Sequence, residues 1–160
     1  MHVVSNSSIL IALSRIGHLW LLEELFNELI VPRAVYDDVV IKGAGKPGSH
    51  DVAEAKWIKV LDVKDTDTLD ELISIIHQGE AEAIELALEI GADLIILDDN
   101  SARQTAIIKG LNVVGTLAVL RRAKEKVLIS ALKPILDALR SVGFYMGNEY
   151  DEILRDAGEN

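Results

Sequence analysis

The stretch DLIIL (Asp93–Leu97) is the clearest strand signal in the sequence, and two acidic residues, Asp98 and Asp99, follow it directly. A continuous apolar run of this length is typical of a strand buried on both faces of a parallel sheet. Parallel strands are joined by crossover connections, which are usually helices. Ligand sites in such α/β proteins form beyond the carboxyl ends of the strands. The stretch therefore predicts an α/β fold and makes Asp98 and Asp99 candidate site residues.

Strand and helix patterns alternate along the rest of the chain. Further strands are predicted at His2–Ser5, Leu29–Val31, Trp57–Val63 and Asn112–Gly115. Helices are predicted at Ser8–Ile16, His18–Asn27, Thr68–Ile76, Glu80–Ile90 and Ser101–Lys109, with others beginning at Pro32, Thr116 and Ser130. A Gly-rich loop is expected at Lys42–His50, and a polar tail from about residue 145. We therefore expect residues 1–160 to form a single domain with three α/β/α layers and a central, mostly parallel sheet.

Composition narrows the functional classes. Of the 160 residues, 49% are hydrophobic, which is enough for a buried core, and none is cysteine. The lack of cysteine excludes a disulfide framework, a zinc–thiolate site and a cysteine nucleophile. The N-terminus has no signal-peptide pattern, and no apolar run approaches the ~20 residues that span a bilayer. We therefore expect a cytoplasmic protein that does not enter a membrane.

The negative charge is concentrated in one part of the chain. The net charge is −10, which disfavours binding to nucleic acid. Residues 65–102 contain 11 of the 26 acidic residues and none of the 16 lysines and arginines, so the remainder of the chain is close to neutral. Such a stretch is either a solvated surface or, where the acids face inward, a binding site for a cation. The positions of the individual acids decide between the two.

Helical periodicity separates inward-facing acids from outward-facing ones. Glu80 shares a face with the apolar residues three, four and seven positions further on, which places its carboxylate on the buried side of its helix. By the same test, Asp38 lies on the apolar side of its own predicted helix. Glu82, Glu85 and Glu89 share a different face, which we expect to be solvated. A buried carboxylate needs a partner, and no Lys or Arg lies near Glu80 in the sequence.

A divalent cation would reconcile these acids if the fold brings them together. Two carboxylates about 5 Å apart repel by roughly 3 kcal/mol at an effective dielectric constant of about 20. Mg²⁺ and Mn²⁺ prefer carboxylate and water oxygens, and either would remove this repulsion. Hydrolysis of a phosphodiester then fits, because the metal neutralises the phosphate, activates a water and orients the leaving oxygen.

Five segments of the chain together resemble the PIN-domain family. They are VVSNSSILIALSRIG near the N-terminus, VPRAVYDDV, QGEAEAIELALE, ADLIILDDNSARQTA and NVVGTLAVL. Each motif is weak alone, but their order over roughly His2 to Phe144 is specific. Within the family the chain resembles VapC-like toxins and their prokaryotic relatives of unknown function. The resemblance implies a ribonuclease that depends on Mg²⁺ or Mn²⁺, forms a homodimer and pairs with an antitoxin.

The resemblance also implies roles for particular residues. Asp38, Glu80 and Asp98 or Asp99 match the family's acidic positions, as catalytic residues and metal ligands, and Thr116 matches a polar position near the site. Ser7 and Glu82 are secondary candidates.

One position departs from the family's pattern. The first strand is followed by Ser5-Asn6-Ser7-Ser8, where the family has an acid in place of Asn6. Asn6 can still offer a carbonyl oxygen to a metal, but it removes one negative charge, so metal affinity should fall. Either activity is reduced, or the remaining acids suffice, or the site has lost catalysis.

Ordinary structural roles compete with these assignments. Asp98 and Asp99 could cap the helix that begins near Ser101, and Glu80 could favour the start of its own helix. The candidate RNA-contacting residues are Arg103, Arg121, Arg122 and Lys124; the alternatives are a salt bridge for the first and a solvated helix face for the others.

Three functions fit these observations. A metal-dependent ribonuclease of the toxin type ranks first. A catalytically weakened or inactive PIN-like module that binds nucleic acid or protein is the alternative, favoured by Asn6 and by the low basic content. A phosphatase or phospho-acceptor receiver domain ranks third, because the first strand ends in Asn6 although Asp98 follows a strand.

Overall fold

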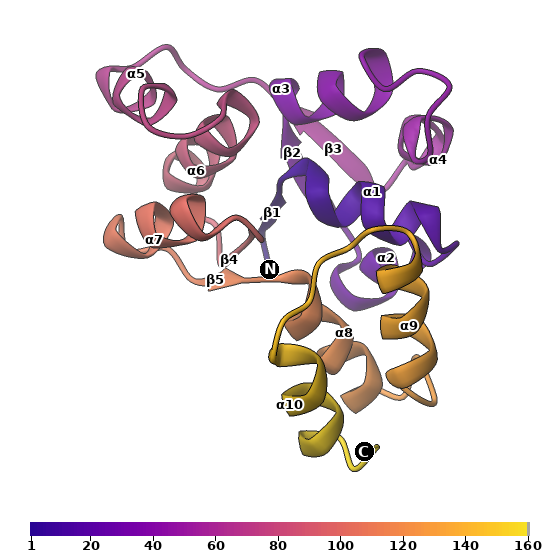
Figure 1. Cartoon of the computed structure of the whole chain (residues 1–160). Helices are drawn as coiled ribbons and strands as arrows, with labels where there is room; N and C mark the ends of the chain where they lie inside the picture. The colour runs from indigo at the N-terminus through magenta and orange to yellow at the C-terminus, as the bar shows by residue number, and fades with distance from the viewer. Residues whose placement is uncertain (160) are drawn as a thin grey trace.

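A computed structural model describes residues 1–159 and places a central five-stranded sheet between two layers of helices (Figure 1). The strands are β1 (Val3–Ser5), β2 (Leu29–Pro32), β3 (Ile58–Leu61), β4 (Leu94–Ile96) and β5 (Val113–Val114). Their order is β3-β2-β1-β4-β5, and every pairing is parallel. The predicted three-layer α/β/α fold is confirmed, and its sheet is parallel throughout.

Most of the helices begin and end close to the predicted positions. They are α1 (Ser7–Arg15), α2 (Trp20–Phe26), α3 (Arg33–Tyr36), the π-helix η1 (Asp37–Ile41), α4 (Ser49–Glu54), α5 (Asp67–Ile73), α6 (Gln78–Ile90), α7 (Asn100–Ile108), α8 (Thr116–Glu125), α9 (Lys133–Ser141) and α10 (Glu149–Asp156). Pro32 ends β2 instead of opening the next helix, which starts at Arg33 and continues as a π-helix. The predicted loop at Lys42–His50 is shorter, because α4 begins at Ser49.

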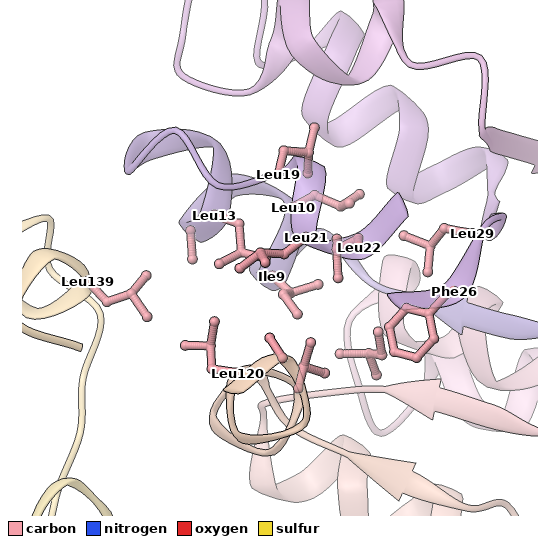
Figure 2. Close-up of a cluster of buried hydrophobic side chains, with 14 of the residues drawn as sticks. Ile9, Leu10, Leu13, Leu19, Leu21, Leu22, Phe26, Leu29, Leu120 and Leu139 are labelled. Carbon is pink, nitrogen blue, oxygen red and sulfur yellow. The ribbon is translucent and has the colours of Figure 1, made fainter. Parts of the chain in front are cut away.

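The two faces of the sheet bury two separate hydrophobic clusters. Val3 and Ile96 face the cluster formed with α1, α2, α8 and α9, whereas Val4 and Ile95 face α5, α6 and α7. This alternation follows from the two-residue period of a strand. Figure 2 shows the first cluster, where side chains such as Leu13 of α1 and Leu120 of α8 converge. Both faces are therefore covered, as the unbroken apolar run of β4 predicted.

The segment expected to be a polar tail contains an amphipathic helix instead. Ile153 and Leu154 of α10 are buried, with 7% and 3% of their surface exposed. Beyond the helix, the Glu159 carboxylate accepts hydrogen bonds from the backbone N–H groups of Leu132 and Lys133 and pairs with the Lys124 ammonium group. The residues after 145 thus close the cluster around α8 and α9, a packed helix that the predicted polar tail did not include.

Strand order determines where a site can form. β1 lies between β2 and β4, so the chain leaves its carboxyl end in one direction to build β2 and β3, and returns on the other side to build β4 and β5. Such a switch point leaves a crevice at the carboxyl ends of the two central strands. Residues after β1 and β4 border it.

None of the helices within residues 1–159 is long and apolar enough to traverse a lipid bilayer.

Candidate functional site

A pocket of about 470 Å³ lies at the carboxyl end of β1. Three segments line it: the residues after β1, the helical turns of α3 and η1, and the first turn of α6. The lining residues are Asn6, Ser7, Ser8, Ala34, Asp37, Asp38, Lys42, His77, Gln78, Gly79 and Glu80. Predicted site residues from three distant parts of the sequence are therefore brought to one place.

Asn6 is the most buried polar residue of this pocket. Only 3% of its surface is exposed, and its backbone N–H donates to the Ile96 carbonyl at 3.3 Å, which ties the end of β1 to β4. Its side-chain oxygen Oδ1 is buried and has no hydrogen-bond donor among the described residues. An unsatisfied buried acceptor costs about 1–3 kcal/mol, so its presence points to a donor or a cation that binds there.

Glu80 contributes a second unpaired oxygen to the same pocket. Its Oε1 is buried without a partner among residues 1–159. Burial and, next, the charge of the neighbouring Asp99 carboxylate raise the pKa of Glu80, although nearby His77 opposes the effect. The predicted inward orientation of Glu80 on its helix therefore agrees with its position. A positive charge nearby would stabilise the ionised form of the Glu80 carboxylate and lower its pKa.

Asp38 lies on the opposite segment of the lining, within η1. A π-turn widens the helix there, with the Lys42 N–H donating to the Asp37 carbonyl, and such turns are frequent at functional sites. Asp38 Oδ1 is 3.5 Å from Lys42 Nζ, and both side chains are substantially exposed. A Cβ atom at Gly79 would lie 3.2 Å from Asp38 Oδ2, so the glycine lets the first turn of α6 approach this carboxylate.

Asp98 and Asp99 have partners within the fold. Both oxygens of Asp98 accept hydrogen bonds from Thr116, from its backbone N–H at 2.8 Å and from its hydroxyl at 2.6 Å. Thr116 is fully buried at the start of α8. Asp99 Oδ2 accepts from the Ala102 N–H at 3.0 Å and caps α7, as the competing interpretation anticipated. Asp99 is still close enough to Glu80 to affect its pKa.

The four acids do not form one compact cluster. Within residues 1–159, no three acidic or histidine side chains are grouped closely enough to hold a metal ion by themselves. Asn6, Asp38 and Glu80 share the pocket, Asp99 adjoins Glu80, and Asp98 lines a second pocket beyond β4.

Two of the three acids on the expected solvated face of α6 are buried instead, and only Glu89 is exposed as expected. Glu82 and Glu85 have 8% and 5% of their surface exposed. Glu82 accepts from the Ala34 N–H at 3.1 Å and from the Gln78 side chain at 3.0 Å, and Glu85 accepts from the Thr66 hydroxyl at 2.9 Å. Glu82 thus satisfies the start of α3, whose first N–H groups have no partner within the helix. These acids join elements together and face away from solvent.

Sequence reasoning missed two basic residues of the pocket. Lys42 follows η1 and His77 immediately precedes α6, and both line the pocket beside the acids. Neither belongs to a motif, so only their positions next to Asp38 and Glu80 could have indicated them.

The predicted RNA-contacting residues have partners within the chain. Arg121 pairs with Glu125 at 3.9 Å, the Arg122 guanidinium lies 5.9 Å from the Phe26 ring centre, and Lys124 pairs with Glu159. Arg103 donates from Nη1 to the Leu97 carbonyl at 3.0 Å. Its expected salt bridge is not formed within the described part of the chain.

Comparison with known families identifies the family to which the chain belongs. A family model described as PIN domain, DUF3368, matches residues 2–159. The chain belongs to the PIN-domain family. PIN domains have a nuclease-type fold, generally depend on divalent metal ions and act on nucleic acids. No curated protein matches the chain.

The side chains of this PIN domain fit a hard divalent cation. All donor atoms offered by Asn6, Asp38 and Glu80 are oxygens, which Mg²⁺ and Mn²⁺ prefer. Mg²⁺ usually keeps several waters and needs only one or two carboxylates, so a group of three acids is not required. The unpaired oxygens of Asn6 and Glu80 would gain the electrostatic partner that the chain does not give them.

Proposed function

We propose that this PIN domain is a divalent-metal-dependent nuclease that hydrolyses RNA phosphodiester bonds. The observation that supports it is the pair of buried, unpaired oxygens, Asn6 Oδ1 and Glu80 Oε1, on one pocket that also contains Asp38. Two acceptors buried without donors cost roughly 2–6 kcal/mol in total. A cation bound by Asn6 Oδ1 and Glu80 Oε1 would remove that cost.

Asn6, Asp38 and Glu80 would hold Mg²⁺ or Mn²⁺, with Asp99 next to Glu80 adding negative charge. The metal supplies charge neutralisation of the phosphate and activation of a water. Asp98 remains a candidate ligand, and its two hydrogen bonds from Thr116 fix the direction of its carboxylate.

The basic residues of the pocket would hold the substrate. Lys42 and His77 border the acids, where they can pair with phosphate oxygens that the acids alone would repel. Arg121, Arg122 and Lys124 remain candidate contacts for RNA outside this pocket.

The test combines metal binding with RNA cleavage. We expect Mn²⁺ titration to release or absorb heat with the wild type and much less with Glu80→Ala, and we expect this variant and added chelator both to abolish cleavage. Glu24→Ala is a matched control, because Glu24 is an exposed acid on α2 outside the pocket. Cleavage that survives both Glu80→Ala and chelator would refute the proposal.

The second candidate function is a weakened or inactive PIN-like module that binds nucleic acid or protein. Asn6 favours it, because an amide stands where the family has an acid. Asn6→Asp distinguishes the two functions. Cleavage by the wild type that Asn6→Asp does not improve supports the first function. A large gain in metal affinity and cleavage indicates a weakened nuclease, and binding with no cleavage in either form indicates an inactive binding module.

A toxin role, a cognate antitoxin and a homodimer are further parts of the proposal, suggested only by the resemblance of the sequence motifs to VapC-like toxins. We expect expression of the wild type, but not of Glu80→Ala, to arrest bacterial growth, and sedimentation to give twice the chain mass. Undiminished growth together with a monomeric mass would rule out the toxin-type assignment and leave the nuclease assignment to the cleavage test.

A further inference from the structure

A second pocket of about 380 Å³ lies beyond the carboxyl ends of β4 and β5. Asp98 and Arg103 line one part of it, and Phe144, Tyr145 and Glu149, from the segment that leads into α10, line another. The proposed nuclease centre shares only the candidate ligand Asp98 with this pocket.

The acids of the second pocket are already hydrogen-bonded. Asp98 accepts two hydrogen bonds from Thr116, and Glu149 Oε2 accepts from the Gly147 N–H at 2.9 Å. Arg103 differs, because a guanidinium has five N–H groups and only one of them donates, to the Leu97 carbonyl, within residues 1–159. Among the charged side chains of this pocket, the Arg103 guanidinium therefore has the most N–H groups free to bind a ligand.

Gly115 makes room for this guanidinium. A Cβ atom there would lie 2.8 Å from Arg103 Nη1 and 3.0 Å from Asp98 Oδ1, distances at which one of the three groups must move. The absence of a side chain at Gly115 therefore leaves room for Arg103 Nη1 beside Asp98.

An aromatic ring, Tyr145, lines the same pocket and is largely uncovered by the chain. Tyr145 has 87% of its surface exposed, the most of any large hydrophobic residue described. Aromatic side chains and Arg together are the means by which proteins bind unpaired nucleotides, through stacking on the base and hydrogen bonds to the phosphate.

The second pocket also lies beside the proposed nuclease centre. β1 and β4 are paired neighbours, with Ser5 opposite Ile96, and neighbouring strands are about 4.8 Å apart. Asn6 and Asp98 follow these strands, so a nucleic-acid strand that crosses the sheet edge passes from the first pocket to the second.

We propose that the second pocket binds one unpaired nucleotide of an RNA strand, with Arg103 on a phosphate and Tyr145 stacked on the base. The proposal rests on the proposed nuclease function, since it names where the substrate continues past the cleavage site.

Binding of a short, labelled single-stranded RNA tests it, measured by fluorescence anisotropy at low salt and with chelator, so that cleavage plays no part. Tyr145→Ala should weaken binding about 5- to 150-fold, because stacking contributes ~1–3 kcal/mol per base. Tyr145→Phe keeps the ring and should bind like the wild type. Val127→Ala, at an exposed apolar residue elsewhere, is the matched control.

The salt dependence of RNA binding tests the role of Arg103. Arg103→Ala should lower the slope of log Kd against log salt by about 0.7, the value for one phosphate contact on a single strand. Equal RNA affinity of the wild type and Tyr145→Ala, or equal loss for perfectly paired duplex RNA, would overturn the second-pocket proposal. Neither result bears on metal-dependent cleavage. A wild type that does not cleave RNA in the presence of metal would instead refute the nuclease proposal.

Discussion

Replacing Thr116 with Val tests whether the start of α8 holds Asp98 in place. Thr116 is fully buried, and its hydroxyl and backbone N–H donate to the two oxygens of Asp98 at 2.6 and 2.8 Å. Valine keeps the shape of the side chain but removes the hydroxyl donor. A hydrogen bond to a charged group contributes about 1.5–3 kcal/mol. Because the backbone bond remains and water reaches the partly exposed Asp98, we expect a loss of about 1.5–2 kcal/mol, near the lower limit.

Urea unfolding, monitored by circular dichroism, measures this loss in the free energy of unfolding. For a chain of 160 residues it corresponds to a fall in Tm of roughly 3–8 °C. Thr105→Val is the matched control, because the Thr105 hydroxyl donates to the Ser101 carbonyl at 2.8 Å on an exposed part of α7. We expect the control to change stability by no more than about 0.5 kcal/mol. A Thr116→Val protein as stable as its control would refute the reasoning.

Three further substitutions probe other parts of the fold. Burial and the Asp99 charge raise the pKa of Glu80, so ionised Glu80 destabilises the metal-free fold above its ordinary pKa of 4.5, and the penalty is relieved as pH falls. Glu80→Gln should therefore be more stable than the wild type at pH 7 without metal in thermal unfolding, and a lower Tm would contradict this. Glu159 behaves oppositely: burial would raise its pKa, but hydrogen bonds from Lys124 and two backbone amides lower that pKa to about 2. Its stabilising contribution is present above pH 4.5 and is lost between about pH 4.5 and 2, so Glu159→Gln should be destabilised in urea at pH 7 but match the wild type near pH 2. A pH-independent difference would disprove that account. Gly115→Ala should cost no more than about 1 kcal/mol in the same assay, because the crowded Arg103 and Asp98 atoms are side-chain ends that can move, and a larger loss would show that both groups are held rigidly.

The strands and one part of the site could be predicted because their signals are local. The apolar run at Asp93–Leu97 contains β4, and the helical face of Glu80 depends only on nearby residues. Strand ends then indicated Asn6 and Asp98, since parallel strands present their carboxyl ends at one edge. The parallel sheet followed from the alternation of strands and helices.

Other features depend on partners that the sequence does not bring together. Glu82 is buried because the Ala34 N–H, 48 positions away, needs an acceptor, and no periodicity reveals such a pairing. Asp98 appeared to be a free ligand because its donor, Thr116, lies beyond a helix and a strand. The helix α10 is different, because Tyr150, Ile153 and Leu154 have helical spacing and a closer reading of the pattern would have predicted it.

The central position of β1 has a consequence for how this protein folds. Val3 pairs with Leu94, so the middle of the sheet closes only after most of the chain is available. Contacts so distant in sequence slow folding, because a large loop must be ordered before they form. A nascent chain that ends before β4 leaves one edge of β1 unpaired, and such edges favour aggregation. The two pockets beyond β1 and β4 therefore assemble late, and a truncated chain exposes an unpaired strand edge in their place.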